Sequence, residues 1–513
     1  GATLVAILAF TPIGFNPGNV GEFCRSLFDV IALSLLLSWL FAITLVPLFS
    51  LWLLKQPKII KQDPYNTKWY KRYRVFLNIC IYNKKITLAI LFLILILSIF
   101  CFKYVPKSFF EGTKRNQFVV DYWKPQSTHI KSTRDDIAKI ENFLMKQDNC
   151  KSVTSFIGEG ALRFILTYVY HAPNTSYGQI LIEVKDYYKM AELMQKCKKY
   201  INANFPDSEA KINPLKESPP VEYPIEIRFR GQDIKILKNL AAKAKNILYK
   251  DEGTCNVRTN WRQRVKVLKP HYSEIKGRSI GITRFDLNNA LLWNFSGVQI
   301  GLYREKDELM PIISRPLKKQ RISINNFKNI QVWNNVTKRF IPIRQVVDKL
   351  ETIMEYPLIH RRNRVPTITV QCSPTNETAT KLRQRLLTKI ASIHIPRGYS
   401  LEWGGEYEEN QKAQGGLKKV FPICLLGMFI LVVGLFNSLR QPIIIFLTIP
   451  LAFIGVSFSL FLFNLAFGFL SILGFLGLTG MLVKNTVVLF DQINLELKEG
   501  KSQYQAVMDS AVS

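Results

Sequence analysis

Acidic side chains are scarce in this sequence. Its 513 residues include 69 lysines and arginines but only 38 aspartates and glutamates, which gives a formal net charge of +31. Such an excess first suggests nucleic-acid binding, but the basic residues are scattered and no nucleic-acid-binding motif accompanies them. We therefore expect no nucleic acid among the partners. A basic cytoplasmic face of a membrane protein explains part of the excess.

Paired cysteines and catalytic motifs are missing as well. None of the eight cysteines forms a CxxC pair, so a zinc or redox motif is not indicated. No nucleophile–base arrangement, glycine-rich phosphate loop or zinc-ligand spacing is present, so we expect neither an enzyme nor a cofactor or resident metal. The chain also begins at Gly1 inside an apolar run, without methionine or a signal peptide, and we expect it to be a piece of a longer protein.

Charge is absent from one long stretch. Residues 441–483 carry no charged side chain, which at ~20 residues per bilayer crossing allows two helices and a hinge. We place the hinge at Asn464–Gly468, a kink at Pro450, and the second helix at about 469–490, with Lys484 inside it. An ammonium group there costs ~2.5–3.5 kcal/mol, so it should face other helices and pair with another group. The alternative is a lysine that reaches the nearby interface.

The apolar runs divide the chain into membrane and soluble parts. The predicted segments are the end of one helix and a complete crossing (1–54), a cytoplasmic loop (55–85), another crossing (86–104), a periplasmic region (105–419), three crossings (420–491) and a cytoplasmic end (492–513). The loop carries nine basic residues against one acid, Asp63, which places it in the cytoplasm by the positive-inside rule. Its aromatic and basic part, YNTKWYKRYRVFLNICIYN, suggests a helix on the membrane surface or, alternatively, a solvated loop.

The region 105–419 contains no membrane-length run and has a mixed α/β pattern. Helical periodicity covers Thr128–Lys146, Asp233–Lys250 and Thr378–Ile393. Strand-like runs are Gln179–Val184, Pro224–Phe229, Val265–Leu268 and Thr367–Val370. This spacing favours ferredoxin-like β-α-β subdomains, so the predicted fold class is a multi-pass α-helical membrane protein with an α/β periplasmic region.

Long motifs in this chain resemble those of the RND (resistance–nodulation–cell division) exporters of the AcrB-like type. The motifs that carry the resemblance are IPRGYSLEWGGEYEENQKAQGGL, LFNSLRQPIIIFLTIPLAFIGV, FGFLSILGFLGLTGMLVKNTVVLFDQIN, TPIGFNPGNVGEFCRSLFDVIALSLLLSWLFAITLVPLFS, GEGALRF, SPPVEYPIEIRFRG, LMPIISR and RRNRVPTITVQ. The match spans essentially the whole chain. It implies transmembrane helices five to ten and the second periplasmic half of such a pump, with a docking part at about 263–351.

The resemblance assigns Lys484 to a proton relay with two aspartates on helix four of the family. Gly474, Gly477 and Gly480 recur every three residues near Lys484 and its neighbour Asn485. They would let another helix approach Lys484 closely, although generic small-residue packing explains them equally well.

The same resemblance places residues 155–173 at a mobile loop beside the substrate pocket. Five side chains of this loop are candidate substrate contacts: Phe156, Arg163, Phe164, Tyr168 and Tyr170. A strand of core aromatics is the alternative. Leu162 stands where related pumps often have proline, which leaves the stiffness of the loop open. Met190 and Met194 lie one helical turn apart, but the chain has only eight methionines, and we do not expect metal export.

The function that the resemblance implies is proton-driven export of amphiphilic compounds or drugs. The expected partners are protons, membrane lipid, a periplasmic adaptor protein and an outer-membrane channel, within a homotrimer in the inner membrane of a Gram-negative bacterium. The alternatives are a membrane scaffold or lipid-interaction protein with the same fold, or the product of a decayed pump gene.

Overall fold

The computed structural model describes residues 1–16, 18–53, 67–109, 115–165, 168–215, 221–318 and 324–512. They form two compact units, one made of Gly1–Trp261 with Ile359–Ser513 and the other of Arg262–Leu358. The first twelve residues of the predicted cytoplasmic loop, with Lys55, Lys58 and Lys61, lie outside the described residues.

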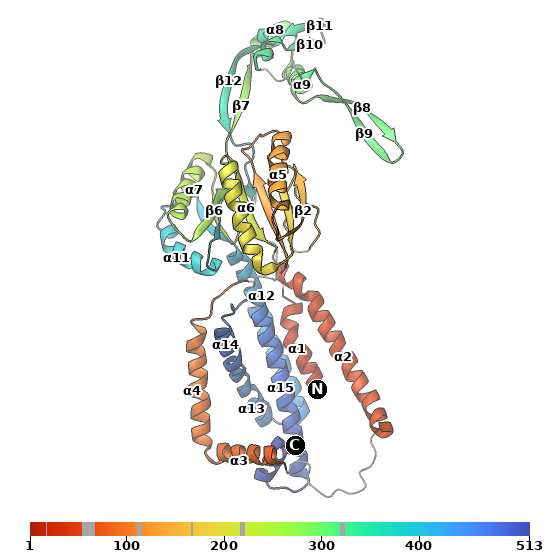
Figure 1. Cartoon of the computed structure of the whole chain (residues 1–513), viewed down its shortest axis with the longest axis vertical. Helices are drawn as coiled ribbons and strands as arrows, with labels where there is room; N and C mark the ends of the chain where they lie inside the picture. Colours follow the sequence, from red (N-terminus) through yellow and green to blue (C-terminus); the bar gives the residue numbers. More distant parts are fainter. Residues whose placement is uncertain are drawn as a thin grey trace. The chain divides into compact units, whose positions relative to one another are not determined.

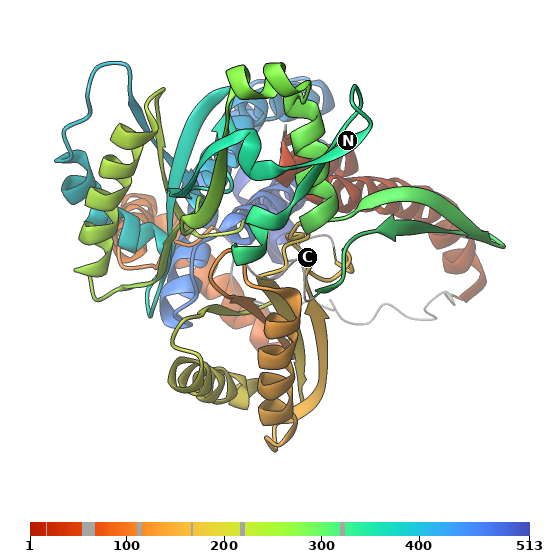
Figure 2. The ribbon, with the colours of Figure 1, turned by 90° about the horizontal axis from the view of Figure 1, so that it is seen from above.

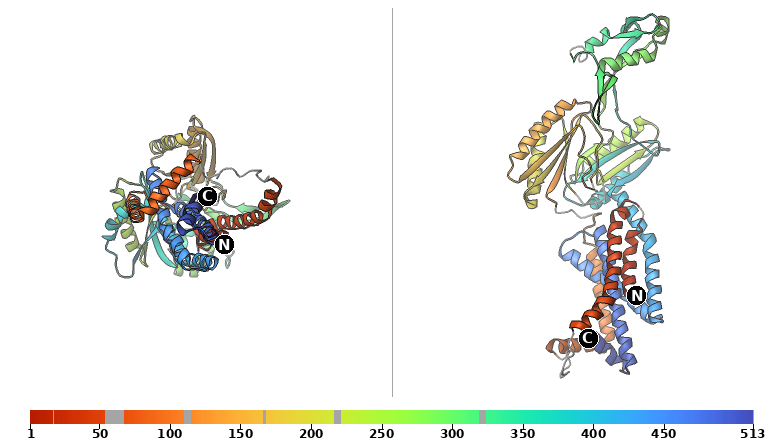
Figure 3. Two further views of the ribbon diagram at one scale, coloured as in Figure 1. Left: turned by 90° about the horizontal axis from the view of Figure 1, so that it is seen from below. Right: turned by 90° about the vertical axis from the view of Figure 1, so that its right-hand side faces the viewer.

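Long apolar helices make up one part of the first unit (Figure 1). They are α1 (Ala2–Gly14), α2 (Asn19–Leu53), α4 (Lys84–Phe102), α12 (Glu406–Phe436), α13 (Arg440–Thr448), α14 (Ala452–Leu462) and α15 (Phe469–Lys498). Among the described residues, five segments are long and apolar enough to cross a membrane: Cys24–Leu53, Lys84–Phe102, Glu406–Phe436, Arg440–Leu462 and Phe469–Lys498. Helix α1 packs against α12 and α15, and Figure 3 shows it in red beside these blue helices.

Two breaks between these helices fall where the sequence predicts them. A 3₁₀ turn at Ile449–Leu451 contains Pro450 and separates α13 from α14, which confirms the predicted kink. Asn464 adopts a left-handed φ of 50°, and α15 begins at Phe469 directly after Gly468, which confirms the hinge. Proline lacks the N–H group that a continuous helix requires, and asparagine tolerates positive φ better than most residues.

Helix α12 differs from its prediction. It begins at Glu406, whereas the expected membrane helix began at Val420. Its first turns are polar but are stabilised by ion pairs of Lys412 with Glu408 (3.0 Å) and Glu409 (2.9 Å). Such pairs, three and four residues apart, support a helix that no apolar face would reveal.

The aromatic and basic part of the predicted cytoplasmic loop is helical over Lys68–Tyr82. Helix α3 (Lys68–Tyr82) buries none of its side chains and contacts α16 (Gln503–Val512). Arg74 lies 3.2 Å from Asp509, and the Tyr504 hydroxyl donates to Asn78 at 2.7 Å.

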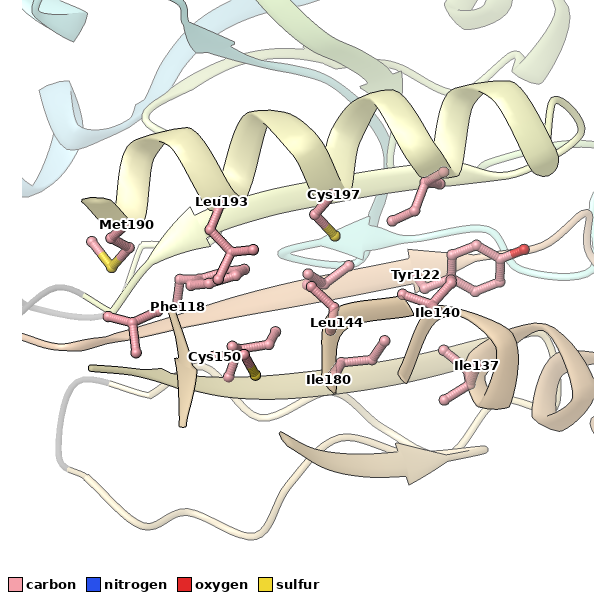
Figure 4. Packing of buried hydrophobic residues seen from close by; sticks show 14 of the residues in the cluster. Phe118, Tyr122, Ile137, Ile140, Leu144, Cys150, Ile180, Met190, Leu193 and Cys197 are labelled. Atoms are coloured by element: carbon pink, nitrogen blue, oxygen red, sulfur yellow. The ribbon is translucent and has the colours of Figure 1, made fainter. Parts of the chain in front are cut away.

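The first α/β sheet follows α4. Its elements run in the order β1 (Gln117–Trp123), α5 (Ile130–Met145), β2 (Cys150–Ile157), β3 (Tyr177–Val184), α6 (Met190–Asn204) and β4 (Glu209–Pro214). The strands are antiparallel in the order β2-β3-β1-β4. The apolar faces of α5 and α6 cover one face of this sheet. Figure 4 shows their shared core, which includes Phe118, Ile140 and Leu193.

A second α/β sheet repeats this pattern. Its elements are β5 (Ile225–Arg230), α7 (Ile234–Tyr249), β6 (Thr254–Thr259), β13 (Arg361–Arg362), β14 (Val365–Pro374), α11 (Ala379–Ala391) and β15 (Ser400–Gly405). Strand β14 pairs with β5 and β6, and β15 pairs with β5, all antiparallel. Disregarding the short β13, the pairing order β6-β14-β5-β15 matches that of the first sheet. Residues 262–358 are inserted between its second and third strands.

The inserted unit has its own small core. Strands β7 (Val265–Tyr272) and β12 (Val347–Glu355) form its antiparallel stem. The remaining elements are α8 (Glu274–Ile280), α9 (Arg284–Phe295), β8 (Val298–Glu305), β9 (Glu308–Ser314), β10 (Gln331–Asn334) and β11 (Arg339–Pro342), with 3₁₀ turns at Ile324–Asn329 and Ile343–Gln345. Ile282, Val332 and Ile343 lie in the core. The green β8–β9 hairpin extends away from this core (Figures 1 and 2).

Candidate functional site

Lys484 lies on α15 beside the strip of that helix that packs against α1. Val483 and Val487 are buried in a cluster with Val5 and Ala9 of α1, whereas Lys484 is exposed. At 3.6 residues per turn, Lys484 is rotated by about 100° from Val483. The ammonium group therefore lies at the edge of the α1–α15 contact and outside its centre.

The glycines near Lys484 have different surroundings. A Cβ atom added at Gly477 would lie 2.8 Å from the Phe10 ring, and one added at Gly480 would lie 2.8 Å from the Cβ of Ala9. Both glycines thus allow the close approach of α1. Gly474 has no described atom within 4 Å of such a Cβ, and Asn485 is exposed.

No carboxylate in the described part of the chain forms an ion pair with Lys484. Asp29 lies on α2 and Asp491 lies two turns further along α15, and both are exposed. The step of seven residues from Lys484 to Asp491 corresponds to ~10 Å of helix.

Residues 155–173, called the aromatic loop below, contain both exposed and buried rings. Phe156 is half-buried on β2, while Phe164 and Tyr170 are 41% and 50% exposed. Arg163 is also exposed. Tyr168 is buried, and its ring centroid lies 5.1 Å from that of Phe164. Neither a wholly exposed loop nor a strand of core aromatics describes this segment.

A buried polar network holds the loop against the first sheet. Gln179 Oε1 accepts hydrogen bonds from the Tyr168 hydroxyl (2.7 Å) and the Ala161 N–H (2.9 Å), which lie on opposite limbs of the loop. The Gln179 amide then donates to Asp121 at 2.9 Å, and the Tyr177 hydroxyl donates to the same carboxylate at 2.7 Å. One glutamine therefore joins the two limbs to β1.

Asp121 and His171 have opposing electrostatic environments. Burial favours neutral Asp121, but the nearby Lys211 and His171 and two donated hydrogen bonds outweigh it and hold the pKa of this carboxyl below its usual value. His171 Nε2 lies 3.7 Å from Asp121 Oδ1. Burial nevertheless lowers the pKa of His171, because the gain from Asp121 is smaller than the cost of desolvation.

Sequence reasoning missed Asp121, Gln179 and His171. Asp121 is separated from Gln179 by 58 positions, so no local pattern marks the pair. The only available signal was a charged residue within the apolar run that forms β1.

The methionine pair does not form an exposed site. Met190 is buried in the core between α5 and α6, and Met194 packs against that core. Among the described residues, no group of three or more His, Cys, Asp or Glu side chains has a geometry that could hold a metal ion.

Comparison with known proteins gives one consistent family. The AcrB/AcrD/AcrF family matches residues 1–513. The cobalt-zinc-cadmium resistance protein CzcA of Cupriavidus metallidurans is 21% identical over 99% of this chain and 49% of its own length. Protein HelA of Legionella pneumophila is 26% identical over 55% of this chain and 27% of its own length.

A crystal structure of a heavy metal efflux pump has the same fold. It superposes with a TM-score of 0.76 at 16% identity and covers 100% of this chain and 51% of the other. The chain thus spans about half the length of the relatives that it matches from end to end. Because the family match covers every residue, the chain belongs to the AcrB/AcrD/AcrF family of RND permeases.

Proposed function

We propose that the chain forms part of a proton-driven export subunit in the inner membrane of a Gram-negative bacterium. The observation that carries this proposal is Lys484, a cation in a membrane-length helix without an ion pair among the described residues. A cation at that depth is costly unless carboxylates approach it.

The relay that we propose has the chemistry of coupled titration. Two carboxylates beside the Lys484 ammonium would share its charge, and protonation of one would release the ammonium toward the other. Such a change of partner links proton binding to helix movement. The carboxylates would come from a helix that is not among these 513 residues, as the family resemblance implies.

Substitution of Lys484 in the full-length pump tests this role. Lys484→Ala should abolish export, and Lys484→Arg should also impair it, because a guanidinium group has a different geometry and does not give up its proton. Lys498→Ala, at the exposed end of the same helix, is the matched control and should keep normal export. Near-normal export by Lys484→Ala at equal expression would exclude the relay.

For the substrate, we propose amphiphilic compounds. The apolar side chains that the aromatic loop exposes support this proposal. Leu162 is 80% exposed, and Phe164 and Tyr170 are also exposed on this anchored loop. Exposed aromatic and aliphatic groups suit ligands with varied shapes. Divalent metal cations are the second candidate, because relatives that match this chain are named for cobalt, zinc and cadmium resistance and for cation efflux.

One set of variants separates the two substrates. If amphiphiles bind the loop, Phe156→Ala and Phe164→Ala should change resistance to some dyes and drugs and leave cobalt, zinc and cadmium resistance unchanged. Lys139→Ala, at an exposed position on α5 outside the loop, is the matched control and should leave both kinds of resistance unchanged. If the wild-type pump confers resistance to the metals but none to the dyes, cation export would be favoured.

For the assembly, we propose two ferredoxin-like subdomains that form the porter, and a docking part within 262–358. The repeated β-α-β-β-α-β order and the common strand order of the two sheets support the first point. The exposed β8–β9 hairpin supports a homotrimer in which it contacts a neighbouring subunit. A periplasmic adaptor and an outer-membrane channel would complete the export path.

A further inference from the structure

Arg383 of α11 lies against two aromatic rings near the start of α12. Its Cζ atom is 3.4 Å from the centroid of the Tyr407 ring and 5.1 Å from that of Trp403. Cation–π contacts of this kind hold a guanidinium group in place without neutralising its charge.

Two other half-buried arginines of the same unit, Arg228 and Arg258, are paired with carboxylates. Arg228 pairs with Glu226 at 2.7 Å, and Arg258 pairs with Glu222 at 2.6 Å. Arg383 forms no ion pair within the described residues, and its Nε atom is buried there without a hydrogen-bond acceptor. Burial also lowers the pKa of Arg383. Arg383 therefore lacks the neighbouring carboxylate that Arg228 and Arg258 have.

A cavity of about 200 Å³ adjoins this guanidinium group. Besides Arg383, Trp403 and Tyr407, its lining includes Phe109, Gln384, Glu406, Asn410, Gln411 and Gln414. The cavity is smaller than the ~300–1,000 Å³ typical of drug-sized ligands. Its lining supplies one cation, one carboxylate and several amides, which suits a small polar group with charges of both signs.

The cavity lies close to the boundary of an apolar helical segment. Gln414 precedes Val420, the start of the apolar part of α12, by six residues on one continuous helix, or ~9 Å. A bilayer adds several ångströms of headgroup on each side of its hydrocarbon core. If α12 crosses the membrane, the cavity opens in the headgroup layer, where tryptophan and tyrosine are also favoured.

We propose that this cavity binds the headgroup of a membrane phospholipid, with Arg383 on the phosphate. Because Glu406 also lines the cavity, a headgroup with an ammonium group, such as phosphoethanolamine, fits better than a purely anionic one. The inference requires that α12 crosses the membrane and does not depend on transport. A lipid at this site would fix α11 of the second sheet to the start of α12.

Lipid binding to the purified chain in detergent tests the proposal. Native mass spectrometry would measure its affinity for phosphatidylethanolamine, phosphatidylglycerol and free phosphoethanolamine in separate arms. Arg383→Gln should weaken phosphatidylethanolamine binding by about tenfold, because a charge-assisted hydrogen bond to phosphate is lost. Lys381→Gln, an exposed position on the same helix, is the charge-matched control and should bind as the wild type does.

A second variant guards against a folding defect. Gln384 is exposed and lines the cavity, so Gln384→Glu should place a carboxylate near Arg383 and weaken lipid binding without disturbing the core. Unchanged phosphatidylethanolamine affinity in both variants would overturn the proposal. So would tighter binding of phosphatidylglycerol than of phosphatidylethanolamine, or binding of free phosphoethanolamine as tight as that of the lipid.

Discussion

Arg385 joins helix α11 to the turn after α7 through a two-point contact with Asp251. Its Nε and Nη2 atoms donate to the two carboxylate oxygens at 3.0 and 2.7 Å. The hydrogen bonds from Arg385 lower the pKa of Asp251 to about 2. A planar guanidinium group matches a carboxylate in this geometry, so the contact fixes both partners.

Asp251→Asn should destabilise the protein by about 1–2 kcal/mol at neutral pH, after allowance for the exposed arginine. Because the folded pKa is depressed, the contribution is fully present above the unfolded value of ~3.9. It disappears as the pH falls through the folded value of about 2. Thermal unfolding of wild type and variant between pH 7 and pH 2 measures this difference.

Glu183→Gln is the matched control, since Glu183 pairs with Lys151 on an exposed surface. It should leave the unfolding midpoint nearly unchanged at every pH. An Asp251→Asn variant with the same midpoint as wild type at pH 7 would show that the two-point contact contributes no net stability.

At the scale of single residues, the sequence reveals candidate functional residues only when they differ in polarity from their neighbours in the chain. Lys484 is visible because a long charge-free run precedes it. The sequence alone does not identify Asp121, Gln179 and Arg383, because the residues that surround them come from distant strands and helices. A charged residue in a mixed α/β segment looks ordinary until the fold shows that Asp121 is buried or that Arg383 lacks a carboxylate.

Among the elements, the amphipathic helices were predicted best. Helices α5, α7 and α11 begin and end within two residues of their predicted bounds, because each has one apolar face against a sheet. Strand β6 was missed, since its residues are all half-buried and show no alternation. The polar start of α12 was missed for a similar reason, as ion pairs rather than an apolar face support it.

The β8–β9 hairpin leaves apolar side chains of both strands uncovered in the described part of the chain. Its apolar side chains are exposed on both strands: Ile300, Leu302, Leu309, Met310, Ile312 and Ile313. An isolated two-stranded hairpin is only marginally stable in water. An exposed apolar hairpin of this kind is therefore typical of a segment that packs against another subunit.

Leu302→Asp should lower the fraction of trimer formed by the full-length protein, because a carboxylate would then be buried at the subunit contact. Light scattering coupled to size-exclusion chromatography in detergent measures that fraction. Glu305→Gln at the end of the same strand, an exposed polar position, should leave it unchanged. A Leu302→Asp protein with wild-type oligomeric mass would contradict the proposed role of the hairpin.

On the scale of the whole molecule, the chain contains two similar sheets between its apolar helices, and the inserted unit interrupts the second sheet. The insertion enters the second sheet between β6 and β14, the position that the aromatic loop occupies in the first sheet between β2 and β3. The same connection thus carries an anchored loop in one subdomain and a separate compact unit in the other. The sequence predicted the α/β class, but this correspondence requires the strand order, which depends on pairing between distant segments.

The proposed coupling to protons would likewise be a property of the whole assembly. Residues 1–513 expressed alone in a pump-deficient host should accumulate a fluorescent dye as the empty vector does, because no described carboxylate pairs with Lys484. Asp29 lies on a different helix, α2, nearer to the start of that helix than to its end. Asp491 lies ~10 Å beyond Lys484 along α15. A lone ammonium group in a membrane helix has no second site with which to exchange a proton. A complete relative expressed from the same vector is the positive control. Proton-dependent dye efflux by residues 1–513 alone would contradict the argument and place the coupling at residues other than Lys484.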